Sequence, residues 1–197
     1  MVMLNSHIIM SNATYFSVDK PINPYYRLDD TLDVVKASQE HDAIRDMMQQ
    51  AGITVTQVEA PAGSQDGVYT ANWALIRGKK AVVARLPAIR QAEEAHARAV
   101  LEHMGIEVVS VPEGLRFSGQ GDALPYGNRL LCGQGYRADE AAQAFAAEQL
   151  GFTRIQLQTI PELDSQARPV INAVSGWPDS FFYDIDLALA IIRPPTE

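Results

Sequence analysis

Hydrophobic and polar positions follow a pattern that occurs three times along the chain. Three segments read as the end of a helix with one polar face, a glycine, and a β-branched strand that ends near a proline: MMQQAGITVTQVEAP, VLEHMGIEVVSVPEG and AEQLGFTRIQLQTIPEL. Their glycines are Gly52, Gly105 and Gly151. Each suits the position after a helix, because glycine adopts the left-handed conformation at the lowest cost. A spacing of roughly 50 residues is typical of a repeated supersecondary unit.

Two hairpins complete the repeated unit. The segments NWALIRGKKAVVAR and DALPYGNRLLCGQG each hold two runs that can pair, joined by a turn that contains glycine. The predicted unit is therefore strand, turn, strand, helix, strand. The segment QDGVYTANWAL is predicted to be the first strand of one unit, with Asp66 at its start and Asn72 inside it.

The predicted fold class is an α/β repeat within one domain, because each unit buries one face against its neighbours. A further unit is expected to open at SFFYDIDLALAIIRP. The whole chain, 1–197, is assigned to this domain, with units at roughly 12–62, 65–113 and 117–163 and a partial fourth unit at 170–197.

Two helices show the apolar faces that such packing requires. In DEAAQAFAAEQLG the apolar positions recur at helical spacing, and Asp139 is placed to cap the helix. The earlier segment TLDVVKASQEHDAIRDMMQQ also has an apolar face. We expect both faces to pack into the core. Their members are Ala142, Phe145, Ala146 and Leu150 in the later helix and Val34, Ala37, Ile44 and Met48 in the earlier one.

Composition narrows the classes of partner. Apolar residues make up 47% and charged residues 20%, as in soluble globular proteins. The net charge of −8 argues against a nucleic-acid partner. The sequence has no apolar stretch long enough for a membrane span and no secretory pattern at its start, so a cytoplasmic protein is expected. A single cysteine, Cys132, and four scattered histidines predict neither a disulfide nor a metal site, and no cofactor is expected.

A glycine-rich turn offers one candidate chemistry. Gly133, Gly135 and Ala138 form G-x-G-x-x-A between a predicted strand and a helix, the context of a dinucleotide-binding turn. However, the next strand, FTRIQLQTI, ends without the acidic residue that would bind a ribose. Cys132, in the apolar run RLLCG, is interpreted as a buried structural thiol rather than a nucleophile.

Polar residues at equivalent places in successive units offer another. Asp66 and Asn72 flank one predicted strand, and Asp122 lies in the matching stretch of the next unit, SGQGDAL. Arg90 and Arg137 follow the two hairpins. Carboxylates accept parallel hydrogen bonds from a guanidinium, and arginines suit the carboxylate at the other end of the same ligand. An arginine-like ligand is thus one interpretation, and turn aspartates with surface arginines are the other.

The runs NPYYR, QDGVYTANWAL, RFSGQGDALPYGNRLLCGQGYRAD and SFFYDIDLALA resemble the guanidine-modifying (pentein) superfamily, in particular dimethylarginine dimethylaminohydrolases and amidinotransferases. The resemblance extends in register from about residue 15 to residue 192. It implies a five-bladed α/β propeller of ββαβ units, which would be incomplete in this chain. It also implies a reaction in which a cysteine attacks the guanidinium carbon, a histidine acts as acid and base, and two carboxylates hold the guanidinium nitrogens.

The resemblance implies roles for particular residues. Asp66 matches an acidic residue of the family, and Arg90 and Arg137 match arginines that bind the substrate carboxylate. Asn72 stands where the dimethylarginine hydrolases have a guanidinium-binding aspartate. Asp184 stands at the position of the catalytic histidine.

Two family features are missing from the sequence as it stands. Ser118 and Gly119 occupy the place of the second carboxylate. The resemblance implies a nucleophile close to the C-terminus of the fifth unit, and Cys132, in the hairpin of the third unit, cannot be that residue. A poor enzyme is therefore expected.

Three hypotheses remain. The first is a hydrolase or amidinotransferase relative that acts on arginine-like substrates and is catalytically incomplete. The second is a non-catalytic protein of the same fold that binds such ligands, or another subunit through an open propeller edge, which would allow a homo-oligomer. The third is a nucleotide-dependent enzyme that uses the Gly133 turn.

Overall fold

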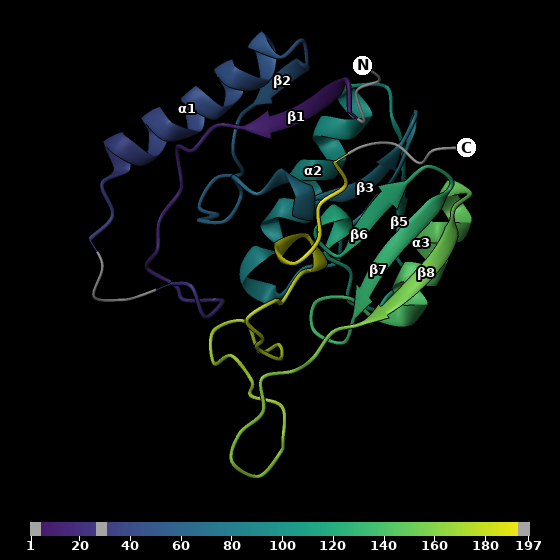
Figure 1. The fold of residues 1–197 in the computed structure, drawn as a ribbon. Helices are drawn as coiled ribbons and strands as arrows, with labels where there is room; N and C mark the ends of the chain where they lie inside the picture. Colours follow the sequence, from purple (N-terminus) through teal and green to yellow (C-terminus); the bar gives the residue numbers. More distant parts are fainter. Residues whose placement is uncertain (1–4, 27–30, 193–197) are drawn as a thin grey trace.

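The computed structural model describes residues 5–26 and 31–192, which form three small sheets with one helix each (Figure 1). The first sheet pairs β1 and β2 around α1; the second orders β3, β4 and β5 with α2; the third orders β6, β7 and β8 with α3. The bounds are β1 His7–Ser11, α1 Val34–Gln50, β2 Thr54–Val58, β3 Ala74–Arg77, β4 Lys80–Val83, α2 Ala92–His103, β5 Glu107–Ser110, β6 Ala123–Tyr126, β7 Arg129–Gln134, α3 Glu140–Leu150 and β8 Thr153–Gln158.

The second and third sheets have the same topology, in agreement with the predicted hairpins and unit order. β3 and β4 are antiparallel, and β5 joins β4 in parallel after α2. β6, β7 and β8 repeat this arrangement around α3. The predicted mixed α/β fold is thus present, although the described residues form three separate open sheets rather than a closed propeller.

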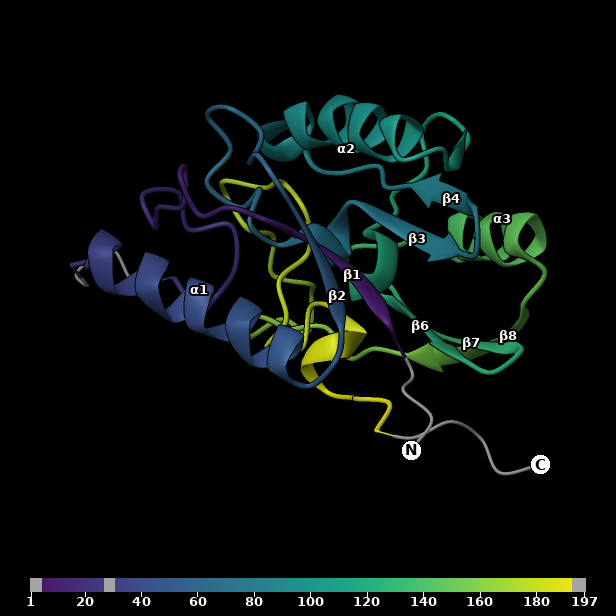
Figure 2. The ribbon, with the colours of Figure 1, turned by 90° about the horizontal axis from the view of Figure 1, so that it is seen from above.

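The first sheet is shorter by one strand. Among the described residues it holds only the parallel pair β1 and β2, so it lacks the hairpin strand that β3 and β6 supply to the other two sheets. β1 packs against the second sheet through Ile9, and α1 lies at the periphery of the molecule (Figure 2).

The predicted glycines located the C-terminal ends of the three helices correctly. Gly52, Gly105 and Gly151 follow the three helices with φ of +85°, +72° and +67°, as predicted for glycines that end helices. Asp33 caps α1, where its Oδ1 accepts a hydrogen bond from the Lys36 backbone N–H at 2.9 Å.

The core lies between the second and third sheets and α3. Leu75, Val82, Phe117 and Leu130 are fully buried there. The α3 face packs into this core as expected, with Ala142 and Ala146 at 0% exposure. The long-range contacts of this core hold the loops that carry the candidate site.

Two predictions about the helices were wrong. No described residue of α1 is buried, and Val34 and Ile44 are half exposed. Among the described helices and strands, the main contact of α1 is with β2. Asp139 precedes α3 but makes no side-chain cap; its carboxylate instead binds the Arg116 guanidinium at 2.6 Å and the Arg116 backbone N–H at 2.7 Å. Bonds to a charged partner outweigh those to a helix terminus.

Two predicted strands take other forms. The residues from Asp66 to Asn72 form a turn and a 3-10 helix, Thr70–Asn72, and β3 begins only at Ala74. The tight turn follows from Gly67, where any side chain would overlap the ring of Pro61. In the predicted fourth unit, residues 170–192 contain a 3-10 helix, Ile185–Leu187, and one isolated bridge but no strand; the remainder of that unit, 193–197, lies outside the described residues.

Over the described ranges, none of the helices has both the length and the apolar character needed to cross a membrane.

Candidate ligand-binding site

A cavity of about 1190 Å³ lies between the first sheet and the loops of the other two. Five of the six predicted site residues line it, and the sixth, Asp122, is buried beside it. None of the six is more than 8% exposed, so the interpretation of Arg90 and Arg137 as surface residues is excluded, although Asp66 does lie in a turn. The five lining residues are Asp66, Asn72, Arg90, Arg137 and Asp184.

The Asp66 carboxylate is held by two donors. Tyr26 donates its hydroxyl hydrogen to Oδ1 at 2.5 Å, and the Gln65 side-chain amide donates to Oδ2 at 3.0 Å. Gln65 is fixed in turn by the backbone of Lys20, through bonds of 3.0 and 2.8 Å. Burial and the nearby Asp66 carboxylate raise the pKa of Tyr26, so the tyrosine remains a donor. The loop before residue 27 therefore shapes this side of the cavity.

Arg90 is bound mainly by the protein itself. Its Nε and Nη2 donate to the two oxygens of Glu93 at 2.8 and 2.6 Å, and Nη2 also donates to the Asp66 carbonyl at 3.2 Å. Nη1 donates to Asn72 Oδ1 at 3.2 Å. Only one of the five guanidinium N–H groups is left for a ligand.

Asp184 is bound through both of its oxygens. Asn72 Nδ2 donates to Oδ2 at 3.1 Å, and the Ser118 hydroxyl donates to Oδ1 at 3.0 Å. The 3-10 helix Gly119–Gly121 makes room for this arrangement, because a Cβ on Gly121 would overlap Asn72 Nδ2 and approach Asp184 Oδ2 to 3.0 Å. Ser118 thus supports the Asp184 carboxylate.

Three carboxylates lie near one another at the segment that carries Asp184: those of Asp122, Asp184 and Asp186. Burial and the Asp184 charge raise the pKa of Asp122 well above its usual range. The Ile185 backbone N–H donates to Asp122 Oδ1 at 3.1 Å and partly offsets this effect. Asp186 is exposed and lines the cavity; partial desolvation and the Asp184 charge raise its pKa to about 7. Neighbouring carboxylates that are shielded from water repel each other, so a proton or a cation between them is favoured. The cluster is thus suited to a cationic group.

Arg137 is a buried cation with few partners. Its Nη2 donates to the Ile22 carbonyl at 3.0 Å, and its guanidinium carbon lies 4.2 Å from the centre of the Tyr183 ring. Its Nε is buried without a hydrogen-bond partner, and among the described residues no carboxylate lies within ion-pair distance of it. Buried polar groups in proteins are almost always paired. This guanidinium therefore has donors available for an anion in the cavity.

The glycine-rich turn does not have the geometry of a nucleotide site. Gly133 lies inside β7, and its backbone N–H donates to the Asp122 carbonyl at 3.2 Å. A side chain there would overlap the Asp122 carboxylate, so the glycine serves close packing. Cys132 is fully buried, and burial raises the pKa of its thiol to about 12, in keeping with a structural residue.

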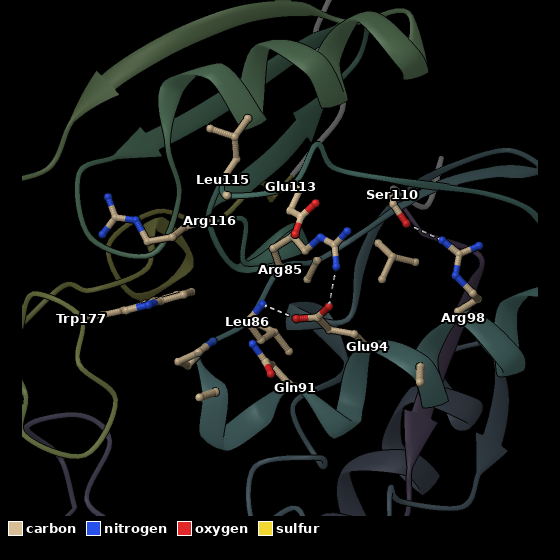
Figure 3. A pocket seen from close by; sticks show the side chains of 16 residues that line it. Arg85, Leu86, Gln91, Glu94, Arg98, Ser110, Glu113, Leu115, Arg116 and Trp177 are labelled. Carbon is tan, nitrogen blue, oxygen red and sulfur yellow. Dashed lines mark hydrogen bonds and ion pairs between the residues drawn. The ribbon is translucent and has the colours of Figure 1, made fainter.

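A second pocket, of about 700 Å³, lies beside α2 (Figure 3). None of the six predicted residues lines it. Its three arginines have protein partners: Arg85 with Glu94 at 3.2 Å, Arg98 with Ser110 at 2.6 Å, and Arg116 with Asp139 at 2.6 Å. The candidate site is therefore the larger cavity, which holds an arginine, Arg137, without an acidic partner in the described part of the chain.

The sequence did not predict the residues that contact the candidate site residues and fix their positions. Glu93 lies three residues after Arg90, an i, i+3 spacing that could have indicated a pair on one helical turn. Tyr26 is part of the NPYYR run. Nothing local marked Tyr183 as the ring beneath Arg137, since the two residues belong to different segments.

No protein-family model matches the chain. Two curated proteins do, and both are named for enzymes that act on arginine or dimethylarginine. The chain is 30% identical over 188 residues to N(G),N(G)-dimethylarginine dimethylaminohydrolase of Mycobacterium tuberculosis, a match that covers 95% of this chain and 56% of that protein. It is 31% identical over 163 residues to the bifunctional arginine dihydrolase/ornithine cyclodeaminase ArgZ of Synechocystis, covering 79% of this chain and 22% of that protein. The chain thus spans about half of the first relative and about a fifth of the second.

Solved structures of similar proteins share the fold. The N-terminal domain of ArgZ bound to substrate has a TM-score of 0.75 at 26% identity, covering 91% of this chain and 61% of that one. A dimethylarginine dimethylaminohydrolase (DDAH) from Pseudomonas aeruginosa, complexed with citrulline, has a TM-score of 0.70 at 18% identity, covering 82% and 64%. These homologues confirm the predicted resemblance to the guanidine-modifying (pentein) superfamily: the chain is similar in sequence and in fold to a dimethylarginine dimethylaminohydrolase and to ArgZ.

Proposed function

We propose that this chain is the ligand-binding portion of a guanidine-modifying protein and that its cavity takes an arginine-like molecule. The observation that carries the proposal is the pairing of a buried, under-partnered Arg137 with a carboxylate cluster around one cavity. The ligand's guanidinium would face Asp66, Asp184 and Asp186. Its carboxylate would bind Arg137, with Arg90 adding at most one N–H.

We also propose that residues 5–192 bind such a ligand without turning it over. The family reaction needs a thiolate and an acid–base group. Cys132, the one cysteine of the sequence, does not line the cavity, and its raised pKa keeps it protonated. Asp184, at the family histidine position, is a carboxylate that accepts two hydrogen bonds, an arrangement suited to hold a cation.

The second candidate function, subunit interaction, is favoured by the edge of β1. In the other two sheets the equivalent strands, β4 and β7, pair with an antiparallel hairpin strand, and β1 has none in the described part of the chain. The five-bladed propeller implied by the resemblance would place a strand of a further unit there. Such an edge also offers a pairing surface for another subunit. A concentration-dependent mass in light scattering would support self-association, and a constant monomer mass would contradict it.

The ligand proposal is tested with three small molecules and one variant. Isothermal titration calorimetry with L-arginine, L-citrulline and agmatine compares ligands with and without the carboxylate. We expect L-arginine to bind at least about tenfold more tightly than agmatine, because a charge-assisted bond is worth about 1.5–3 kcal/mol. Arg137→Met should remove that difference and leave agmatine binding unchanged. Equal binding of L-arginine and agmatine to the unmodified protein would remove Arg137 from the site, and ornithine or citrulline formed from L-arginine would contradict the absence of turnover.

A further inference from the structure

Glu93 is a fully buried acid that does not line the cavity and has no part in the proposed binding of a ligand. It lies on the first turn of α2. Its Oε1 accepts hydrogen bonds from the Ser64 hydroxyl at 2.6 Å and from Arg90 Nε at 2.8 Å, and its Oε2 accepts from Arg90 Nη2 at 2.6 Å. The two parallel bonds fix the plane of the Arg90 guanidinium as well as its position.

The fixed guanidinium determines how the next side chain is oriented. Arg90 Nη1 points at the Asn72 amide, and an arginine can only donate. On its other side, the amide meets the Ser118 carbonyl at 3.1 Å, and a carbonyl can only accept. Asn72 must therefore turn Oδ1 toward Arg90 and Nδ2 toward Ser118. The opposite orientation would set donor against donor and acceptor against acceptor.

This orientation determines what Asn72 can do in the cavity. The second hydrogen on Nδ2 is donated to Asp184 Oδ2 at 3.1 Å, so both amide hydrogens are used within the protein. Asn72 thus holds Asp184, together with the Ser118 hydroxyl on Oδ1, and leaves each Asp184 oxygen a lone pair for a ligand.

We infer that Glu93 is a positioning residue: through Arg90 it orients the Asn72 amide, which in turn fixes the Asp184 carboxylate at the cavity. The inference concerns the geometry of the proposed binding site and rests on the proposed function only for its effect on ligand affinity. The contacts run from Ser64 and Glu93 through Arg90 and Asn72 to Asp184, and every link is a buried hydrogen bond.

The first test needs no ligand. In ¹⁵N-labelled protein, the Asn72 side-chain amide is identified as the signal pair lost in Asn72→Ala, and its hydrogen exchange is measured. We expect Glu93→Gln to shift this pair and to speed its exchange. The matched control is Glu94→Gln, the same substitution at the adjacent residue, whose carboxylate faces the second pocket. The buried Gln143 amide, bound to the Asp122 carbonyl at 3.2 Å, reports any general loosening.

The outcomes separate positioning from a purely structural role. An Asn72 pair that moves in Glu93→Gln while the Gln143 pair stays supports the inference. An unchanged Asn72 pair, or equal changes in both pairs, overturns it. If Glu93→Gln does not fold, Arg90→Lys is measured in its place, because a lysine keeps the charge beside Glu93 but loses the fork. Asn72 should again lose its fixed orientation, and a signal like that of the unmodified protein would count against the inference.

The second test uses affinity for L-arginine in a double-mutant cycle. We expect Glu93→Gln to weaken binding about tenfold in the unmodified background and by less than about twofold in Asn72→Ala, because the residue acts through the amide. The same factor in both backgrounds would refute the inference. If the unmodified protein binds neither L-arginine nor L-citrulline, the proposed function fails, while the ligand-free measurement still decides the role of Glu93.

Discussion

Arg90 and Arg137 are equally buried, at 3% exposure, but the structure predicts opposite consequences for the same substitution. Arg90→Met would leave the Glu93 carboxylate buried and without its bidentate partner. Removing one partner of a buried ion pair costs about 3–5 kcal/mol, because the other charge stays uncompensated. Arg90→Met should therefore destabilise the protein severely.

For Arg137→Met, the contributions to the free energy of unfolding oppose one another. The variant loses one charged hydrogen bond, worth about 1.5–3 kcal/mol, and a cation–π contact of about 2 kcal/mol. Against this, it removes the desolvation cost of a buried guanidinium that has no acidic partner within residues 5–26 and 31–192, a cost of several kcal/mol. The terms nearly cancel, so the free energy of unfolding of the ligand-free protein should change by less than about 1 kcal/mol, while affinity for L-arginine falls.

Equilibrium unfolding in urea, followed by fluorescence of the buried Trp73, gives both values by linear extrapolation. Far-ultraviolet circular dichroism provides the check on two-state behaviour. The reasoning would be refuted by equal losses in the two variants, or by a loss above about 3 kcal/mol for Arg137→Met.

Three further predictions concern single residues. Gly121→Ala should weaken L-arginine binding, because the new Cβ displaces the Asn72 amide from Asp184; titration calorimetry measures this, and unchanged affinity would show that the amide has room to move. The pKa of Asp186 is raised from 3.8 to about 7, so this residue stabilises the folded state fully below about pH 4 and less as pH rises through 7. Asp186→Asn should flatten the fall in unfolding free energy between pH 4 and 7 in urea titrations. A thiol reagent should label Cys132 only on unfolding, and rapid labelling of the native protein would contradict its burial.

Local features of the fold were predictable from sequence because their causes are local. Glycine after each helix reflects a conformation that one residue adopts without its neighbours. The hairpins β3–β4 and β6–β7 follow from short glycine turns between runs that pair at close range. The six candidate site residues were found from their equivalent places in successive units and from a family resemblance, and the structure brings five of them to one cavity.

Partnerships between distant residues were decided only by the tertiary structure. The sequence predicted a capping role for Asp139 and a buried face for α1, but the first depends on where Arg116 lies and the second on which elements cover the helix. Asn72 and Asp184 are 112 residues apart, so no local pattern shows that one holds the other. Side-chain type and spacing set the conformations that a short segment can adopt. Packing of distant segments determines which polar group each buried side chain meets, and that choice distinguishes the occupied Arg90 from the available Arg137.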